Sequence, residues 1–162
     1  MERAEGGCLC GAVRYAVEKR PARVTMCHCR FCQRSTGAAY MVQPAVARDD
    51  IVVTRGVPKV YTHVSTGSGK EIHIHFCETC GTKLFQTFER FAGAAGIYAG
   101  TLDDPNWIAI RPETDKHIFL EAGRAETLVP AHLPLFEGHA MENDGTPNVA
   151  RVLHASSRID EM

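Results

Sequence analysis

Hydrophobic and polar residues alternate with a period of two along much of the chain, which is the pattern of strands that bury one face. The clearest alternations are residues 13–18, built on valine and tyrosine, and residues 71–76, where isoleucine and phenylalanine share one face. Residues 51–54 form a β-branched run that also favours strand. Turn-forming Gly, Pro and Asp residues separate these runs at 56–58, 65–69, 103–105 and 111–112. The pattern predicts a mainly β domain of short antiparallel strands with little helix.

Helix signals are confined to two short segments. One follows Cys29 and is long enough for one or two turns, and the other begins at Thr146-Pro147. From Met141 the chain becomes polar, as in the run Glu142-Asn143-Asp144-Gly145. We therefore expect one zinc-binding β domain over residues 1–140 and a polar C-terminal tail over residues 141–162 that packs loosely or not at all.

The charge of the chain is nearly balanced. Its 162 residues carry Lys+Arg 18 against Asp+Glu 19, a net charge of −1. This provides neither the basic field that nucleic-acid binding needs nor a polybasic patch for anionic lipid. The acidic, glycine-rich N-terminus does not look like a secretory signal, and the apolar runs are far shorter than the ~20 residues of a membrane-spanning helix. We expect a cytoplasmic protein with no nucleic-acid partner and no membrane partner.

Seven cysteines fall into three clusters, and the odd number excludes complete pairing in internal disulfides. In a reducing compartment such clusters more often bind metal. The pair Cys77-x-x-Cys80 can chelate one tetrahedral ion where the chain turns tightly, and Gly81 permits the positive φ of such a turn. Cys8 and Cys10 supply the second pair. Together the four cysteines predict a closed zinc site, which is structural because it has no open coordination position.

The remaining Cys27, Cys29 and Cys32 lie on one six-residue stretch. Three thiolates leave the fourth tetrahedral position open, which distinguishes catalytic from structural zinc. Two zinc ions per chain are therefore predicted, although thiolates also accept iron or Cu(I). The alternative is a second closed site completed by a histidine, for which His28 is the nearest. On an extended backbone its side chain points away from the neighbouring cysteines, which favours a role in packing or in supporting the ligands from behind over ligation.

Arg30 and Arg34 flank the open site. A guanidinium at this place can bind a substrate carboxylate through two parallel hydrogen bonds. The alternative is that both are ordinary solvated surface arginines. Phe31 and Tyr40 could line a pocket nearby, although aromatic residues beside strands more often serve the core.

The cysteine motifs and the segments between them resemble the glutathione-dependent formaldehyde-activating enzyme family, which also includes centromere protein V. The similarity covers about residues 5–138 and is carried by Cys8-Leu9-Cys10-Gly11, Cys27-His28-Cys29-x-x-Cys32-Gln33-Arg34-x-x-Gly37, Cys77-x-x-Cys80-Gly81-Thr82, Ile97-Tyr98-Ala99-Gly100-Thr101-Leu102-Asp103-Asp104-Pro105, Arg111-Pro112, His117-Ile118-Phe119 and Leu133-Pro134-x-Phe136-Glu137. The resemblance implies a β-tent fold stapled by the four-cysteine zinc. It also implies a second zinc at the three-cysteine cluster, taken in the family as the catalytic one.

The implied chemistry is the formation or cleavage of a carbon–sulfur bond on a glutathione adduct, such as S-hydroxymethylglutathione formed from glutathione and formaldehyde. Two segments depart from the family pattern. Residues 121–127 lack the aromatic residues that members often carry there, and Ala131-His132 replaces a frequent Asp-Gly. These departures concern the pocket side. We therefore expect a broader class of ligand, which is a glutathione or other thiol adduct of a small electrophile.

Two functions of different classes follow. The first is an enzyme, a zinc-dependent carbon–sulfur lyase or synthase. The second is a non-catalytic zinc-binding module for partner interaction, as centromere protein V suggests. A module for polyanionic partners is expected to carry a basic extension, whereas the tail of this chain contains Glu142, Asp144, Asp160 and Glu161. Charge and the open zinc position therefore favour the enzyme.

Overall fold

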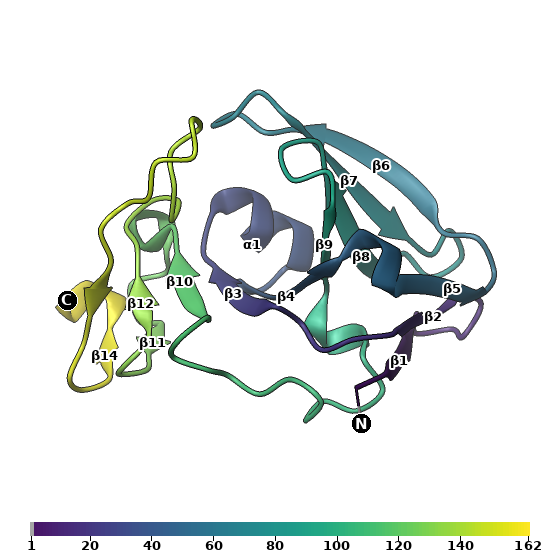
Figure 1. The fold of residues 1–162 in the computed structure, drawn as a ribbon, viewed down its shortest axis with the longest axis horizontal. Coiled ribbons are helices and arrows are strands. Elements are labelled where there is room, and N and C mark those ends of the chain that lie inside the picture. Colours follow the sequence, from purple (N-terminus) through teal and green to yellow (C-terminus); the bar gives the residue numbers. More distant parts are fainter. Residues whose placement is uncertain (1) are drawn as a thin grey trace. The chain divides into compact units, whose positions relative to one another are not determined.

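The fold is that of a computed structural model, which describes residues 2–162. Strands dominate it, and one α-helix, α1 (Arg30–Thr36), lies among the described residues (Figure 1). The expectation of a mainly β protein with little helix is therefore confirmed. Contacts divide the chain into two compact units. The first consists of the residues up to Ala22 together with Pro44–Ala109, and the second of Arg23–Gln43 and Ile110–Met162.

A three-stranded antiparallel sheet in the first unit has the order β1-β2-β5. Its strands are β1 (Ala4–Gly7), β2 (Arg14–Val17) and β5 (Ile51–Arg55). Tyr15 and Val17 are completely buried, as the alternation of residues 13–18 predicts. The ring of Tyr15 lies beside Gly6, where an added Cβ would come within 2.6 Å of the Tyr15 hydroxyl. Only glycine fits there, which explains part of the glycine-rich start of the chain.

The remaining strands of the first unit, with β4 belonging to it from Pro44 onward, form an antiparallel sheet in the order β4-β9-β8-β7-β6. They are β4 (Met41–Ala47), β6 (Lys59–Val64), β7 (Glu71–Phe76), β8 (Lys83–Phe88) and β9 (Ala94–Ile97). Ile74, at the centre of the alternating run, is buried and pairs with Tyr61 and Gln86. The turn signals at 65–69 close the β6–β7 hairpin. Short 3-10 helices connect other elements: η1 (Arg48–Asp50) and η2 (Ala99–Thr101).

In the second unit the strands follow the order β13-β12-β10-β3, in which β10 pairs in parallel with both β3 and β12, and β13 pairs antiparallel with β12. Its strands are β3 (Arg23–Cys27), β10 (Lys116–Ile118), β11 (Leu128–Val129), β12 (Pro134–Leu135), β13 (Arg151–Val152) and β14 (Ser157–Arg158), and its 3-10 helices are η3 (Leu120–Ala122) and η4 (Ile159–Glu161). The buried Asp115 carboxylate joins β3 to the segment before β10. It accepts hydrogen bonds from the backbone of Val24 and Arg111, both at 2.6 Å, and from the Thr114 hydroxyl at 2.9 Å.

The C-terminal residues differ from what the sequence predicts. No helix begins at Thr146, because its backbone N–H donates to Asp144 Oδ1 at 2.9 Å and closes a local turn instead. Further on, β13 pairs with β12 and β14 with β11. Leu153, Ile159 and Met162 pack against a buried cluster in the same unit. Loose packing is therefore wrong for these segments, while the division of the chain at residue 140 stays a prediction.

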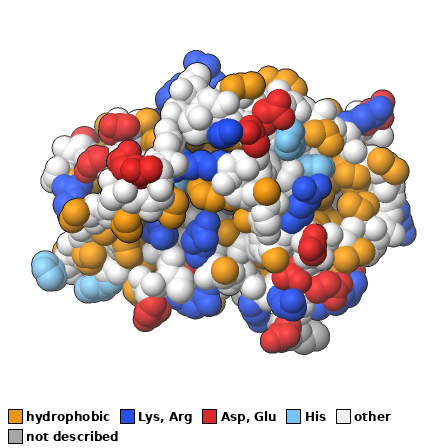
Figure 2. Space-filling view, turned by 45° about the horizontal axis from the view of Figure 1, so that its top comes forward, with side chains coloured by type: hydrophobic (Ala, Val, Ile, Leu, Met, Phe, Trp, Pro, Cys, Tyr) orange, Lys and Arg blue, Asp and Glu red, His pale blue; other side chains and the backbone are white. Residues whose placement is uncertain are grey.

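The surface carries charges of both signs. Acidic and basic side chains are interspersed over the face shown in Figure 2, in keeping with the near-zero net charge. Among residues 2–162, no helix has the length and apolar character needed to span a bilayer. Cytoplasmic localisation stays a prediction.

Candidate metal centres

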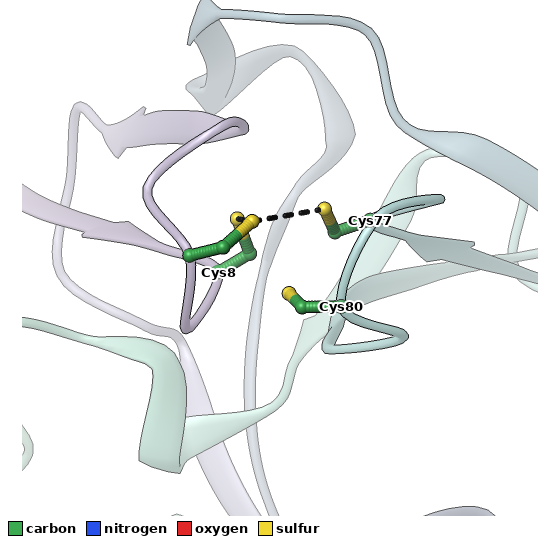
Figure 3. A group of neighbouring side chains, drawn as sticks. Cys8, Cys77 and Cys80 are labelled. Atoms are coloured by element: carbon green, nitrogen blue, oxygen red, sulfur yellow. Dashed lines mark hydrogen bonds between the residues drawn. The ribbon is translucent and has the colours of Figure 1, made fainter.

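Two tight turns of the first unit bring four cysteines together. Cys8 and Cys10 lie in the turn after β1, where the Gly11 N–H donates to the Cys8 carbonyl at 3.1 Å. Cys77 and Cys80 lie in the β7–β8 turn, where the Gly81 N–H donates to the Cys77 carbonyl at 2.8 Å. Gly81 has φ 72°, the left-handed conformation expected for this turn. Figure 3 shows the sulfur atoms of Cys8, Cys77 and Cys80 directed toward one another.

The spacing of these sulfur atoms fits a tetrahedral metal ion. All four lie within 4.8 Å of one another. The Sγ atoms of Cys8 and Cys10 are 3.6 Å apart, and those of Cys10 and Cys77 are 3.7 Å apart. Zinc with Zn–S bonds of about 2.3 Å places its sulfur ligands about 3.8 Å apart. Four thiolates would fill the coordination sphere, so this cluster suits a structural ion.

Hydrogen bonds prepare one sulfur of this group for deprotonation. The Thr82 hydroxyl lies 3.2 Å from Cys80 Sγ. Together with the backbone N–H of the same residue, it lowers the pKa of the Cys80 thiol to about 5. Cys8 and Cys77 are buried and belong to the hydrophobic core of the first unit. The cluster is therefore anchored in the core on both of its turns.

The other three cysteines lie at a strand-to-helix junction in the second unit. Cys27 ends β3, Cys29 is the N-cap of α1, and Cys32 stands in the first turn of the helix. As an N-cap, the Cys29 sulfur accepts a hydrogen bond from the Cys32 backbone N–H at 3.4 Å. Helix α1 ends at Gly37, whose φ of 73° is the usual left-handed stop. The short helix that the sequence predicts after Cys29 is present.

The capping geometry gathers these three sulfurs into one group. All three lie within 4.8 Å of one another, and the Sγ atoms of Cys27 and Cys29 are 3.5 Å apart. Hydrogen bonds from Cys27 and Cys32 lower the pKa of the Cys29 thiol to about 3 and raise the pKa of the two donor thiols. Within residues 2–162, no fourth His, Cys, Asp or Glu joins the group. The donor set fits a thiophilic ion with one open position.

His28 does not close the three-cysteine group. It is completely buried, and its Nε2 lies 2.9 Å from Nδ1 of His117 on β10. Burial lowers the pKa of both imidazoles to about 4. His28 is therefore not the fourth ligand of a closed site. Its ring is packed against His117 in the interior, in agreement with the packing role.

Two buried polar residues that support the cysteine loop were not singled out from the sequence. One is His117. The other is Gln33, whose Nε2 donates to the carbonyls of His28 at 2.6 Å and Ala122 at 2.7 Å. Both residues lie in motifs noted in the sequence, His117-Ile118-Phe119 and Cys32-Gln33-Arg34, and this was their signal. A polar side chain that is buried usually has a hydrogen-bonding role.

Arg30 and Arg34 lie four positions apart on α1 and share one exposed side of the helix. Arg30 Nη1 donates to Gln33 Oε1. Arg34 stands in the last turn of the helix. The structure thus leaves both guanidinium groups on the solvent side of the helix that carries Cys32, and their contact with a substrate stays a prediction.

The chain is similar to a family model, to a curated protein and to a solved structure. The family model described as "Glutathione-dependent formaldehyde-activating enzyme" matches residues 3–122. A Halomonas elongata protein named "Putative glutathione-dependent formaldehyde-activating enzyme" is 27% identical over 120 residues, which cover 72% of this chain and 74% of that protein. A crystal structure of a Rhodobacter sphaeroides protein aligns with a TM-score of 0.47 at 22% identity, covering 67% of this chain and 92% of that one. The family match spans most of the chain and includes all seven cysteines, so this protein belongs to the glutathione-dependent formaldehyde-activating enzyme family.

Proposed function

We propose that this protein is a zinc-dependent carbon–sulfur lyase or synthase that acts on a thiol adduct of a small electrophile. Membership of the family favours glutathione as the thiol and formaldehyde as the electrophile. The observation that carries the proposal is the convergence of three cysteine sulfurs at the start of α1, with no fourth protein ligand among residues 2–162. A second ion, held by the four-cysteine group, would be structural.

Cys27, Cys29 and Cys32 would hold the catalytic ion. Zinc with three thiolate ligands offers one open position and acts as a Lewis acid that stabilises negative charge on sulfur or oxygen. In the synthetic direction, the thiol sulfur attacks the carbonyl carbon, so that the S–H bond and the π bond of the carbonyl break, one C–S bond forms, and the thiol proton ends on the former carbonyl oxygen. The reverse reaction breaks the same bond. The reaction conserves all atoms and needs no further co-reactant.

Arg30 and Arg34 would orient the adduct. Glutathione carries two carboxylates, and each guanidinium can bind one of them through two hydrogen bonds. Because both side chains are exposed, each contact would contribute modestly, about 1 kcal/mol or less. The expected role is therefore to select and align the thiol, with the chemistry left to the cysteine group.

The test is exchange between glutathione, ¹³C-labelled formaldehyde and S-hydroxymethylglutathione, followed by NMR on zinc-loaded protein. We expect exchange faster than in buffer with free zinc, and loss of the acceleration in Cys29→Ser. Serine remains a good N-cap, so α1 should persist in this variant. Native-like exchange in Cys29→Ser, or no acceleration with any thiol–aldehyde pair, would contradict the proposal. The second result would favour a non-catalytic zinc-binding module.

A further inference from the structure

A pair of buried histidines lies directly behind the three-cysteine group. His28 stands between two of the cysteines with 0% exposure, and His117 on β10 has 2%. Their rings are joined by the hydrogen bond between Nε2 and Nδ1 and are stacked, with centroids 5.2 Å apart and planes at 28°. The outer nitrogens, His28 Nδ1 and His117 Nε2, have no hydrogen-bond partner among the described residues 2–162. Within this described part of the chain, each imidazole therefore makes one hydrogen bond, which is to the other.

This hydrogen bond contributes to stability because both rings are removed from solvent and cannot bond to water instead. One ring donates its N–H and the other accepts it. Removing either ring would leave a buried polar nitrogen of the other without a partner, and that costs about 1–3 kcal/mol. The orientation of His28 is therefore tied to the position of His117.

The backbone of His28 is held by the same neighbourhood. Its N–H donates to the carbonyl of Ile118, one residue after His117, at 3.0 Å. Its carbonyl accepts from Gln33 Nε2 at 2.6 Å. Strand β10 is itself fixed, since Ile118 pairs with Cys27 and the Phe119 N–H donates to the Gly138 carbonyl at 2.8 Å. The residue between the two cysteines is thus attached at its amide, its carbonyl and its ring.

We infer that His117 is a positioning residue of the three-cysteine site, which sets through His28 how Cys27 and Cys29 present their sulfurs to a metal ion. The inference rests on the proposed function in requiring metal at this cluster. Side chains alternate along an extended backbone, so a ring locked on one side fixes the directions of the neighbouring side chains on the other. Partners beyond the ligands of metal sites typically change metal affinity by 10–100-fold. Because His117 acts through one intervening residue, about 10-fold is expected.

The test compares Co²⁺ affinity at the two cysteine clusters of the full chain, using chelator competition and the visible absorption of Co²⁺–thiolate centres. In His117→Phe the three-cysteine site should bind Co²⁺ about 10-fold more weakly, with the four-cysteine site unchanged. In His117→Asn the amide can occupy the place of Nδ1, so affinity should return toward that of the native protein. In His117→Gln the amide falls at the place of Nε2, so affinity should stay low.

His75→Phe is the matched control. His75 is a half-buried strand histidine of the first unit, hydrogen-bonded to Thr87 at 3.3 Å, and its loss should leave the three-cysteine site unaffected. A general loss of stability would weaken both clusters alike and would not separate Asn from Gln. Native Co²⁺ affinity in His117→Phe, or equal affinity in the Asn and Gln variants, would overturn the positioning role of His117. Either result would leave the proposed metal site standing. If His117→Phe does not fold, the difference in Co²⁺ affinity between His117→Asn and His117→Gln tests the positioning role. Failure of the native three-cysteine site to bind Co²⁺ would refute the proposed metal site as well.

Discussion

The two cysteine clusters should differ sharply in how much they stabilise the fold, and a matched pair of double variants tests this. Cys77→Ser with Cys80→Ser removes one buried and one half-buried cysteine from the four-cysteine group. Cys32→Ser with Cys29→Ser removes one buried and one half-buried cysteine from the three-cysteine group. Because each pair places one serine in a buried and one in a half-buried position, the direct cost of the substitutions is similar. The remaining difference reports the metal cross-link.

The size of that difference follows from the lengths of the loops that each ion would close. Cys10 and Cys77 are 67 residues apart in the chain, whereas Cys27 and Cys32 are only 5 apart. Treated as a cross-link, the long closure removes about 4 kcal/mol of chain entropy from the unfolded state, and the short one about 2 kcal/mol. The four-cysteine variant should therefore lose about 2 kcal/mol more stability than its counterpart. At this chain length that is about 4–8 °C in Tm.

The assay is thermal unfolding followed by circular dichroism, with metal content measured on the same samples. Chelator-stripped protein serves as the control, because both double variants should then melt close together. We expect the three-cysteine variant to keep one zinc ion and a cooperative transition, since serine still caps α1. A three-cysteine variant that melts at or below the Tm of the four-cysteine variant, with both carrying their remaining metal, would contradict a stabilising role specific to the four-cysteine cluster.

Three further predictions concern metal content, ligand binding and a buried carboxylate. Reduced protein should carry up to two zinc ions per chain and release the first from the three-cysteine site, and elemental analysis that finds only one tightly held ion would count against this. Arg34→Ala should weaken glutathione binding up to about fivefold in calorimetry, and unchanged binding would remove the arginine from the site. Asp115→Ala should lower the free energy of unfolding by about 3 kcal/mol or more, because it removes the acceptor of two backbone N–H donors. Denaturant unfolding measures this loss, and a value below about 0.5 kcal/mol would contradict the role of Asp115.

The cysteine arrangement was predictable from the sequence because each half of each cluster is local. The turn of Cys77-x-x-Cys80-Gly81 and the cap-to-helix spacing of Cys29 and Cys32 are set by a few residues. Local spacing sorts the seven cysteines into two pairs and one triple, and joining the two pairs follows because a closed tetrahedral site needs four ligands. Period-two alternation likewise predicted β2 and β7, although Ala16, on the opposite face of β2 from Tyr15 and Val17, is buried as well.

The second unit was less predictable for physical reasons. Several of its strands are only two or three residues long, too short to show a period, and the parallel pairing of β3, β10 and β12 depends on contacts distant in sequence. The polar run after Met141 suggested a loose tail, yet the apolar Leu153 and Ile159 pack on a buried cluster. His117 is equally hard to find, since its hydrogen bond to a residue 89 positions away has no local signature.

Sequence separation also explains why one cluster suits a structural role and the other a working role. The four-cysteine group joins two turns whose buried members belong to the core of the first unit, so losing its ion would release a long loop and expose core residues. The three-cysteine group is confined to a strand end and one turn of α1. The backbone of His28 donates to the Ile118 carbonyl and accepts from the Gln33 amide, the His28 ring is hydrogen-bonded to His117, and none of these bonds needs metal. A site of this kind can exchange a ligand at its open position while the surrounding fold stays in place. Chemistry on a thiol adduct requires that property, and the closed cluster does not have it.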